Sequence, residues 1–120
     1  MKEDNIMVKK IEVTDYKYEL RNMADENIAI VYLINGNDLI CMSVFHDSDD
    51  EELPPPREGL NGVVYVACKF NWLKNIIDML RNEKPVFFLW NRESQIATIS
   101  TENENVGDEE RNSLLKFIFG

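Results

Sequence analysis

The 120-residue chain is poor in several residue types that mark particular classes of protein. It has one histidine, two cysteines and five glycines. A single histidine rules out zinc sites built from several imidazoles. The glycines form no phosphate-cradling G-x-x-x-x-G-K pattern, and the nucleophile motif G-x-S-x-G is missing. Cys41 and Cys68 each lie in an apolar run, so we expect buried, reduced thiols rather than a disulfide.

Long apolar runs and clusters of basic residues are also missing. The longest apolar runs, IAIVYLI at 28–34 and VVYVAC at 63–68, are far shorter than the roughly 20 residues of a membrane helix. The first residues contain no apolar core of a signal peptide. Lys9–Lys10 is the only adjacent basic pair, whereas binding to a nucleic-acid backbone needs a cluster of Lys and Arg. We therefore expect a cytoplasmic protein without a membrane partner, and nucleic acid is disfavoured as a partner.

Negative charge is what the chain has in excess, with a formal net charge of −9. The acids gather in two segments. The stretch HDSDDEELPPPREG at 46–59 holds six acids against one arginine, and 102–110 holds five acids and no base. The rest of the chain carries 11 acids and 12 bases. The body of the protein is therefore close to neutral, and its acidity belongs to these two segments.

The first acidic segment matches a calcium-binding loop only in part. With Asp47 as the first position, Asp49, Glu51 and Glu58 fall at the third, fifth and twelfth positions, where such a loop has its ligands. The sixth position needs glycine for a sharp turn but holds Glu52, and three prolines then stiffen the chain. We therefore predict neither a metal site nor a cofactor.

A proline-rich acidic loop is the remaining interpretation, over 46–61 of a single domain that spans 1–120. Prolines after a run of like charges favour an extended, self-repelling segment. Such a loop is either a solvated connection between strands or a docking surface for a basic partner.

A β-hairpin is the clearest structural signal. Two β-rich runs flank Asn35-Gly36, a dipeptide that tolerates the positive φ angles of a tight turn. With these two residues as the loop, Tyr32 faces Leu39 and Ile30 faces Cys41. Both runs are apolar at nearly every position, which predicts a central place in the sheet.

An amphipathic helix is predicted over 71–84. Trp72 and Ile76 begin a stripe of apolar residues at helical spacing, Asn71 is a candidate N-cap, and Pro85 ends the helix. This helix either joins two parallel strands as a crossover or packs on an antiparallel meander.

The other segments complete an α+β domain. Apolar residues stand at Ile11 and Val13 and then at Tyr16, Tyr18 and Leu20, so their alternation shifts by one residue at Thr14–Asp15. This shift predicts two short strands with a turn or one strand with a bulge. Residues 86–90 and 95–101 read as strands, and 108–119 as a terminal helix. The prediction is a five- to six-stranded mixed or mainly antiparallel sheet with two helices packed on one face.

Bulky apolar side chains occupy both faces of the strand at 86–90 and crowd the C-terminus. They form either a two-sided core within one chain or a self-association face of a homodimer. The candidate residues for self-association are Phe88, Trp90, Phe117 and Phe119.

These observations favour a non-enzymatic protein-interaction or oligomerisation module that forms a homodimer and docks a basic protein partner. The acids predicted to bind that partner are Asp47, Asp49, Asp50, Glu51, Glu52, Glu102 and Glu104. One alternative is a small-ligand-binding domain or enzyme with a pocket near the strand–helix–strand unit, where His46 or Asp47 would act as an acid–base group. Another is an acidic inhibitor that imitates nucleic acid, which the 13 basic residues weaken. The sequence nominates no catalytic residue.

Overall fold

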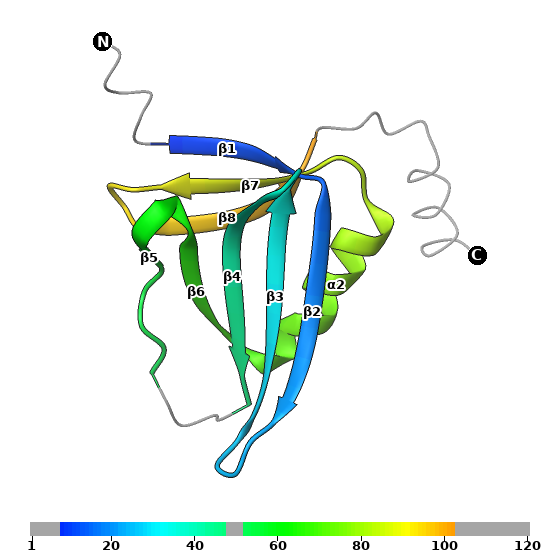
Figure 1. Ribbon diagram of the computed structural model, residues 1–120, viewed down its shortest axis with the longest axis vertical. Coiled ribbons are helices and arrows are strands. Elements are labelled where there is room, and N and C mark those ends of the chain that lie inside the picture. Colours follow the sequence, from blue (N-terminus) through cyan, green and yellow to red (C-terminus); the bar gives the residue numbers. More distant parts are fainter. Residues whose placement is uncertain (1–7, 48–51, 103–120) are drawn as a thin grey trace, which may run out of the picture.

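The computed structural model describes residues 8–47 and 52–102, which form eight strands, two short 3-10 helices and one α-helix (Figure 1). The strands are β1 (Val8–Val13), β2 (Asp15–Asn22), β3 (Asn27–Asn35), β4 (Asp38–His46), β5 (Arg57–Glu58), β6 (Val64–Lys69), β7 (Val86–Asn91) and β8 (Ile96–Thr101). The helices are η1 (Leu60–Gly62), η2 (Phe70–Trp72) and α2 (Leu73–Asn82). The terminal helix predicted at 108–119 lies outside the described residues.

The strands form two sheets, which confirms the α+β class and the five-stranded mixed sheet, whereas the separate three-stranded sheet was not predicted. The larger sheet has the order β2-β3-β4-β6-β5, and the smaller has the order β1-β7-β8. Neighbouring strands are antiparallel except β4 and β6, which are parallel. The acidic loop is the connection between these two parallel strands. The crossover considered for the helix is not formed, because β6 and β7 belong to different sheets.

Thr14 is where the chain passes from the small sheet to the large one. Val13 ends β1 opposite Val86 of β7, and Asp15 begins β2 opposite Ile34 of β3. The backbone N–H of Thr14 donates to the carbonyl of Ile34 at 2.9 Å. The shift in the alternation of apolar residues at Thr14 therefore marks the point where the chain leaves one sheet for the other.

The hairpin forms between β3 and β4, with a register that differs from the prediction. Its two loop residues are Gly36, at φ 63°, and Asn37, so glycine takes the first loop position as in a type II′ turn. A register shift follows in the first pairs of the hairpin. As a result Tyr32 faces Met42 instead of Leu39, and the later pairs are displaced likewise.

The α-helix is shorter than predicted and has no side-chain N-cap. Asn71 lies in η2, and the N-cap position of α2 is Trp72, which forms no capping hydrogen bond through its side chain. The helix ends at Asn82, before Pro85 as expected. The cap prediction failed because the single 3-10 turn of η2 leads directly into α2.

The helix and the small sheet both lie on one face of the large sheet, and the core is between them (Figure 1). The buried residues of this cluster are Ala29, Val31, Leu33, Ile40, Cys41, Phe45, Val64, Ile77, Phe88 and Trp90. We call this covered side of the large sheet the inner face and the opposite side the outer face. Since strands alternate, every second residue of β3, β4 and β6 is left on the outer face.

Candidate functional site

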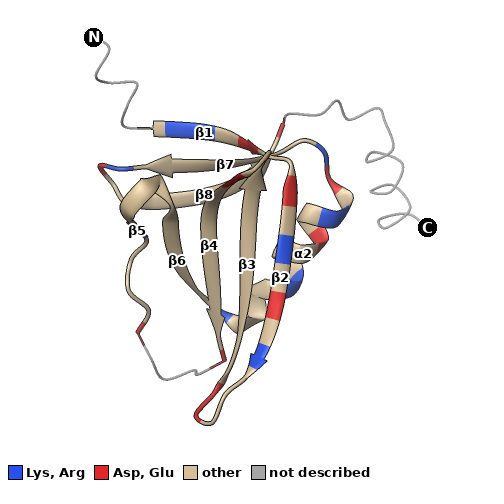
Figure 2. Ribbon diagram, in the orientation of Figure 1, with Lys and Arg blue, Asp and Glu red and all other residues tan. Residues whose placement is uncertain are grey.

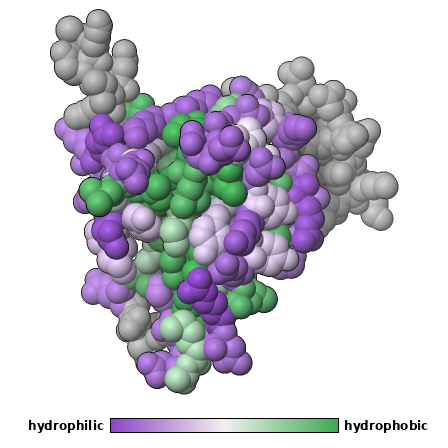
Figure 3. Space-filling model, viewed as in Figure 1, coloured by the Kyte–Doolittle hydropathy of each residue, from purple (hydrophilic) through white to green (hydrophobic). Residues whose placement is uncertain are grey.

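The outer face carries an apolar area that neither α2 nor the small sheet covers. Tyr32 faces Met42, which faces Tyr65, and in the next row Ile30 faces Val44, which faces Ala67. We call these six residues and Ile28 the outer patch. Only Ile30 is buried, and the other members are partly exposed. Figure 3 shows hydrophobic surface over the middle strands with hydrophilic residues on both sides.

Cations stand at both ends of the Tyr–Met–Tyr row. The ammonium of Lys17 lies 5.3 Å from the centre of the Tyr32 ring, and the guanidinium carbon of Arg57 lies 5.1 Å from that of Tyr65. Contacts of this kind hold a cation against an aromatic face. Each tyrosine of the outer patch thus has a cation from a neighbouring strand over its ring.

The charges on β2 neutralise one another to a large extent. Glu19 accepts hydrogen bonds from Arg21 at 3.0 Å and from the Tyr32 hydroxyl at 3.2 Å, and lies 3.5 Å from the Lys17 ammonium. The hydrogen bond from Arg21 is the main reason that the pKa of Glu19 is lowered. Figure 2 shows the alternation of red and blue along this strand.

The first acidic segment begins and ends at the margin of the outer patch. His46 ends β4 beside Ile28, and the segment returns at Arg57, which lies on the ring of Tyr65. Asp47 accepts a hydrogen bond from the backbone N–H of Asn27 at 3.3 Å. Glu52 is exposed. Three of the acids predicted to bind a partner in this segment lie outside the described residues: Asp49, Asp50 and Glu51.

The two acidic segments start at opposite ends of the fold. Glu102 follows β8, whose last residue pairs with Val86 near the change of sheet at Thr14. Asp47 follows the far end of β4 (Figure 1). Glu104 lies outside the described residues. Of the two acidic segments predicted to bind a partner, the first therefore lies beside the outer patch. The second begins, at Glu102, far from the outer patch.

The strand at 86–91 turns its largest side chains inward. Phe88 is 3% exposed and Trp90 is 2% exposed, in the core of the single chain. They are therefore not available as the self-association surface predicted for them. Phe87 and Leu89 point to the other side, where the ammonium of Lys10 lies 4.4 Å from the centre of the Phe87 ring. The other two candidates, at 117 and 119, lie outside the described residues.

Glu58 is the centre of a polar cluster that joins β5 to the small sheet. Its carboxylate accepts hydrogen bonds from the indole N–H of Trp90 at 3.0 Å, from Arg92 at 2.7 and 3.1 Å, and from the Lys9 ammonium at 3.3 Å. The Arg92 hydrogen bonds are the largest cause that lowers its pKa to about 2. In the sequence, Glu58 is one more acid of the loop. Its partners are too far away in sequence for spacing to reveal them.

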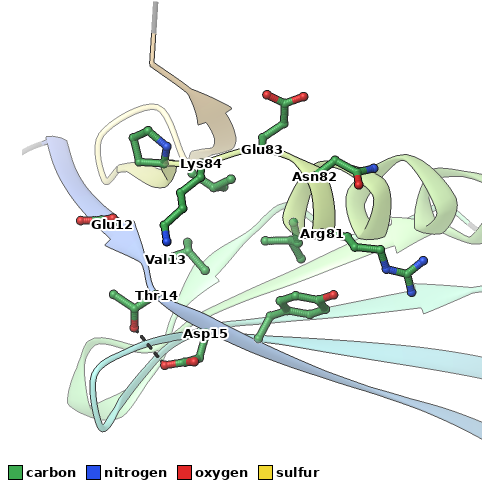
Figure 4. Close-up of a pocket in the computed structure, with 12 residues that line it drawn as sticks. Glu12, Val13, Thr14, Asp15, Arg81, Asn82, Glu83 and Lys84 are labelled. Carbon is green, nitrogen blue, oxygen red and sulfur yellow. Dashed lines mark hydrogen bonds between the residues drawn. The ribbon is translucent and has the colours of Figure 1, made fainter. Parts of the chain in front are cut away.

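A cleft of about 640 Å³ lies where the chain changes sheet and faces the end of α2. Figure 4 shows charged side chains of both signs around it, with Lys84 directed toward Val13. The lining contains three acids and two bases but neither histidine nor cysteine. The Thr14 hydroxyl is already bonded to Asp15 at 3.2 Å. The same hydroxyl lies 3.3 Å from the carbonyl oxygen of Ile34 and accepts a hydrogen bond from the backbone N–H of Gly36 at 2.8 Å, so it is engaged within the fold.

His46 is tied to the turn between β2 and β3. Its Nδ1 lies 2.9 Å from the carboxylate of Glu26, and both side chains are about three-quarters buried. Neither His46 nor Asp47 lines the 640 Å³ cleft. A substrate bound in this cleft would therefore not contact either of the two residues considered as an acid–base group.

Within residues 8–47 and 52–102, no group of three or more His, Cys, Asp or Glu side chains is placed to hold a metal ion. No helix in this part of the chain is long and apolar enough to cross a membrane. Comparisons with protein-family models, with curated proteins and with solved structures find no match for this chain.

Proposed function

We propose that this chain is a non-enzymatic protein-interaction module that binds a basic partner through the outer patch and the acidic segment beside it. The observation that carries the proposal is the outer patch itself. Its rows run across three adjacent strands, and the helix and the small sheet both lie on the opposite face. Contiguous apolar surface that is rimmed by polar residues is typical of an interaction site.

Charge favours a basic partner over a second copy of the chain. Glu19 neutralises its neighbours on β2, and Arg57 is held against Tyr65. The segment at 47–52, by contrast, has five acids in six residues, and the chain has a net charge of −9. Two copies of a chain with this net charge would repel each other, whereas a partner rich in Lys and Arg would be attracted. The patch would supply most of the affinity, and the acids would raise the association rate.

A selection from a displayed library of random 12-residue peptides tests this proposal. We expect the selected peptides to combine apolar residues with Lys or Arg. Their affinity should fall at least tenfold for Val44→Lys, because a charge then occupies the centre of the patch. The matched control is Ile96→Lys on β8, where the side chain is 57% exposed on the other sheet. This control should bind as the wild type does.

Neutralising the acids at 47, 49, 50, 51 and 52 to Asn or Gln tests the electrostatic part. We expect a slower association and a weaker dependence on salt. The proposal fails if the selection yields no basic peptides, or if the selected peptides bind Val44→Lys as tightly as the wild type. A dimer in light scattering that Val44→Lys dissociates would assign the patch to self-association instead.

A further inference from the structure

A second cavity, of about 280 Å³, lies between α2 and the two sheets. The inner face of the large sheet forms one wall with Phe45 and Val66, and the helix contributes Ile76. The small sheet closes it with Phe88 and Ile99. The cavity is thus on the opposite side of the large sheet from the outer patch, and what it binds is independent of the function proposed above.

The lining of this cavity contains no charged side chain. Hydrogen-bonding side chains are few, and Ser43 and Cys68 are the two on the wall formed by the large sheet. Burial raises the pKa of the Cys68 thiol to about 11, so the thiol is neutral near pH 7. Within residues 8–47 and 52–102, the one polar contact of the Ser43 hydroxyl is weak, at 3.6 Å from the sulfur of Cys41. Its hydrogen-bonding capacity is therefore largely free for a ligand.

Two residues that line the cavity, Trp72 and Thr98, are exposed, Trp72 by 57%, so solvent reaches the margin of the cavity. An apolar cavity of about 150 Å³ accommodates benzene, so a cavity of this size has room for about eleven non-hydrogen atoms. Pockets with mainly apolar walls and a few polar groups are the usual form of small-molecule sites. An ionised ligand would lose its hydration here without gaining a charged partner.

We propose that this cavity binds a neutral aromatic or alicyclic molecule about the size of naphthalene, oriented by a hydrogen bond to the Ser43 hydroxyl. The ligand enters beside Trp72 and packs against the apolar wall of the inner face. A carboxylate of the same size is rejected, because the lining offers it no cation.

Titration with 1-naphthol, followed by the methyl resonances in NMR, tests this inference. We expect saturable shifts for Val66, which lines the cavity, and none for Val44, which lies on the outer face of the neighbouring strand. Ala97→Phe, which fills the cavity, should lower the affinity at least tenfold. The matched control Ala67→Phe adds the same bulk on the outer face and should leave the affinity unchanged. The anion 1-naphthoate should bind at least tenfold more weakly.

A second measurement in the wild-type protein does not depend on the folding of any variant. Bound 1-naphthol should slow the alkylation of Cys68, which lines the cavity, and leave that of the fully buried Cys41 unchanged. Ser43→Ala should weaken binding about fivefold through loss of one hydrogen bond. The inference is overturned by absence of saturable binding at millimolar 1-naphthol, by equal affinities of the two phenylalanine variants, or by shifts at Val44 instead of Val66.

Discussion

Replacement of Glu58 by alanine should destabilise the protein as much as many core substitutions, although Glu58 belongs to a strand of only two residues. Its carboxylate is the acceptor for the indole N–H of Trp90 and for the side chains of Arg92 and Lys9. These bonds join β5 to β1 and β7, so they connect the end of the acidic loop to the small sheet. Loss of the carboxylate removes all of them together.

The magnitude follows from the burial of each partner. Trp90 is 2% exposed, and a buried donor that loses its acceptor costs about 1–3 kcal/mol. Arg92 and Lys9 remain partly exposed, so each ion pair contributes only about 0.2–1 kcal/mol. We therefore expect Glu58→Ala to lower the free energy of unfolding by about 1.5–5 kcal/mol. Glu58→Gln, which retains an acceptor for the indole, should lower it by about 1 kcal/mol.

Urea denaturation followed by circular dichroism measures both variants at pH 7. The matched control is Glu93→Ala, an exposed acid in the turn between β7 and β8, which should change the free energy by less than about 0.5 kcal/mol. The reasoning is refuted if the alanine and glutamine variants of Glu58 are equally stable. In that event the buried indole would not depend on this acceptor.

The same carboxylate sets a pH dependence. Its pKa is lowered from 4.5 to about 2. Because the pKa is lower in the folded protein than in the unfolded chain, the ionised carboxylate stabilises the fold. This contribution is complete at pH values above the pKa of the unfolded chain, and it is lost as the pH falls through the pKa of the folded protein. The difference in unfolding free energy between the wild type and Glu58→Gln should be constant above about pH 5, should fall between about pH 5 and pH 2, and should vanish only below about pH 2. A difference that persists unchanged at about pH 1 would have packing as its cause instead.

Two further predictions concern the glycine before η1 and the thiols. A β-carbon on Gly59 would lie 2.5 Å from the Tyr65 ring, at a φ of −98° that alanine accepts, so Gly59→Ala should cost about 1–3 kcal/mol in urea denaturation. A Tyr65→Ala background should remove most of that cost, and an unchanged cost would exclude the clash as its cause. Burial raises the pKa of Cys68 to about 11 and that of Cys41 to about 12, from 9.0. Both thiols should therefore react at least about 100-fold more slowly with Ellman's reagent at pH 8 than in urea, with Cys68 first.

Local structure could be predicted from the sequence because it depends on neighbouring residues. The β-rich runs around 28–34 and 63–68 became the central strands β3 and β6, and the apolar stripe after Trp72 became α2. The hairpin signal at Gly36 was correct in kind. Its register was wrong for two reasons. The loop residues are Gly36 and Asn37 instead of Asn35 and Gly36, and a further shift between Leu33 and Ile34 depends on the packing of the sheet, which the dipeptide at the turn does not encode.

The division into two sheets could not be predicted, because it depends on partners remote in sequence. Only Thr14 separates β1 from β2, yet β1 pairs with β7 and β2 pairs with β3. The shift in the alternation of apolar residues at this point is compatible with a bulge, a turn or a change of sheet. The Glu58 cluster escaped prediction for the same reason. Its partner Trp90 is 32 residues away, and the acids nearby made Glu58 look like part of a solvated loop.

The edges of the large sheet bear on how a partner would bind. One edge is β2, where Lys17, Glu19 and Arg21 alternate along the outer face and bond to one another. The opposite edge is β5, which has only two residues. Charged and very short edge strands are both features that oppose the addition of a further strand. A partner that paired with an edge would also leave the outer patch in water. Binding across the face of the sheet is therefore the arrangement that uses both the apolar rows and the acidic segment at their margin.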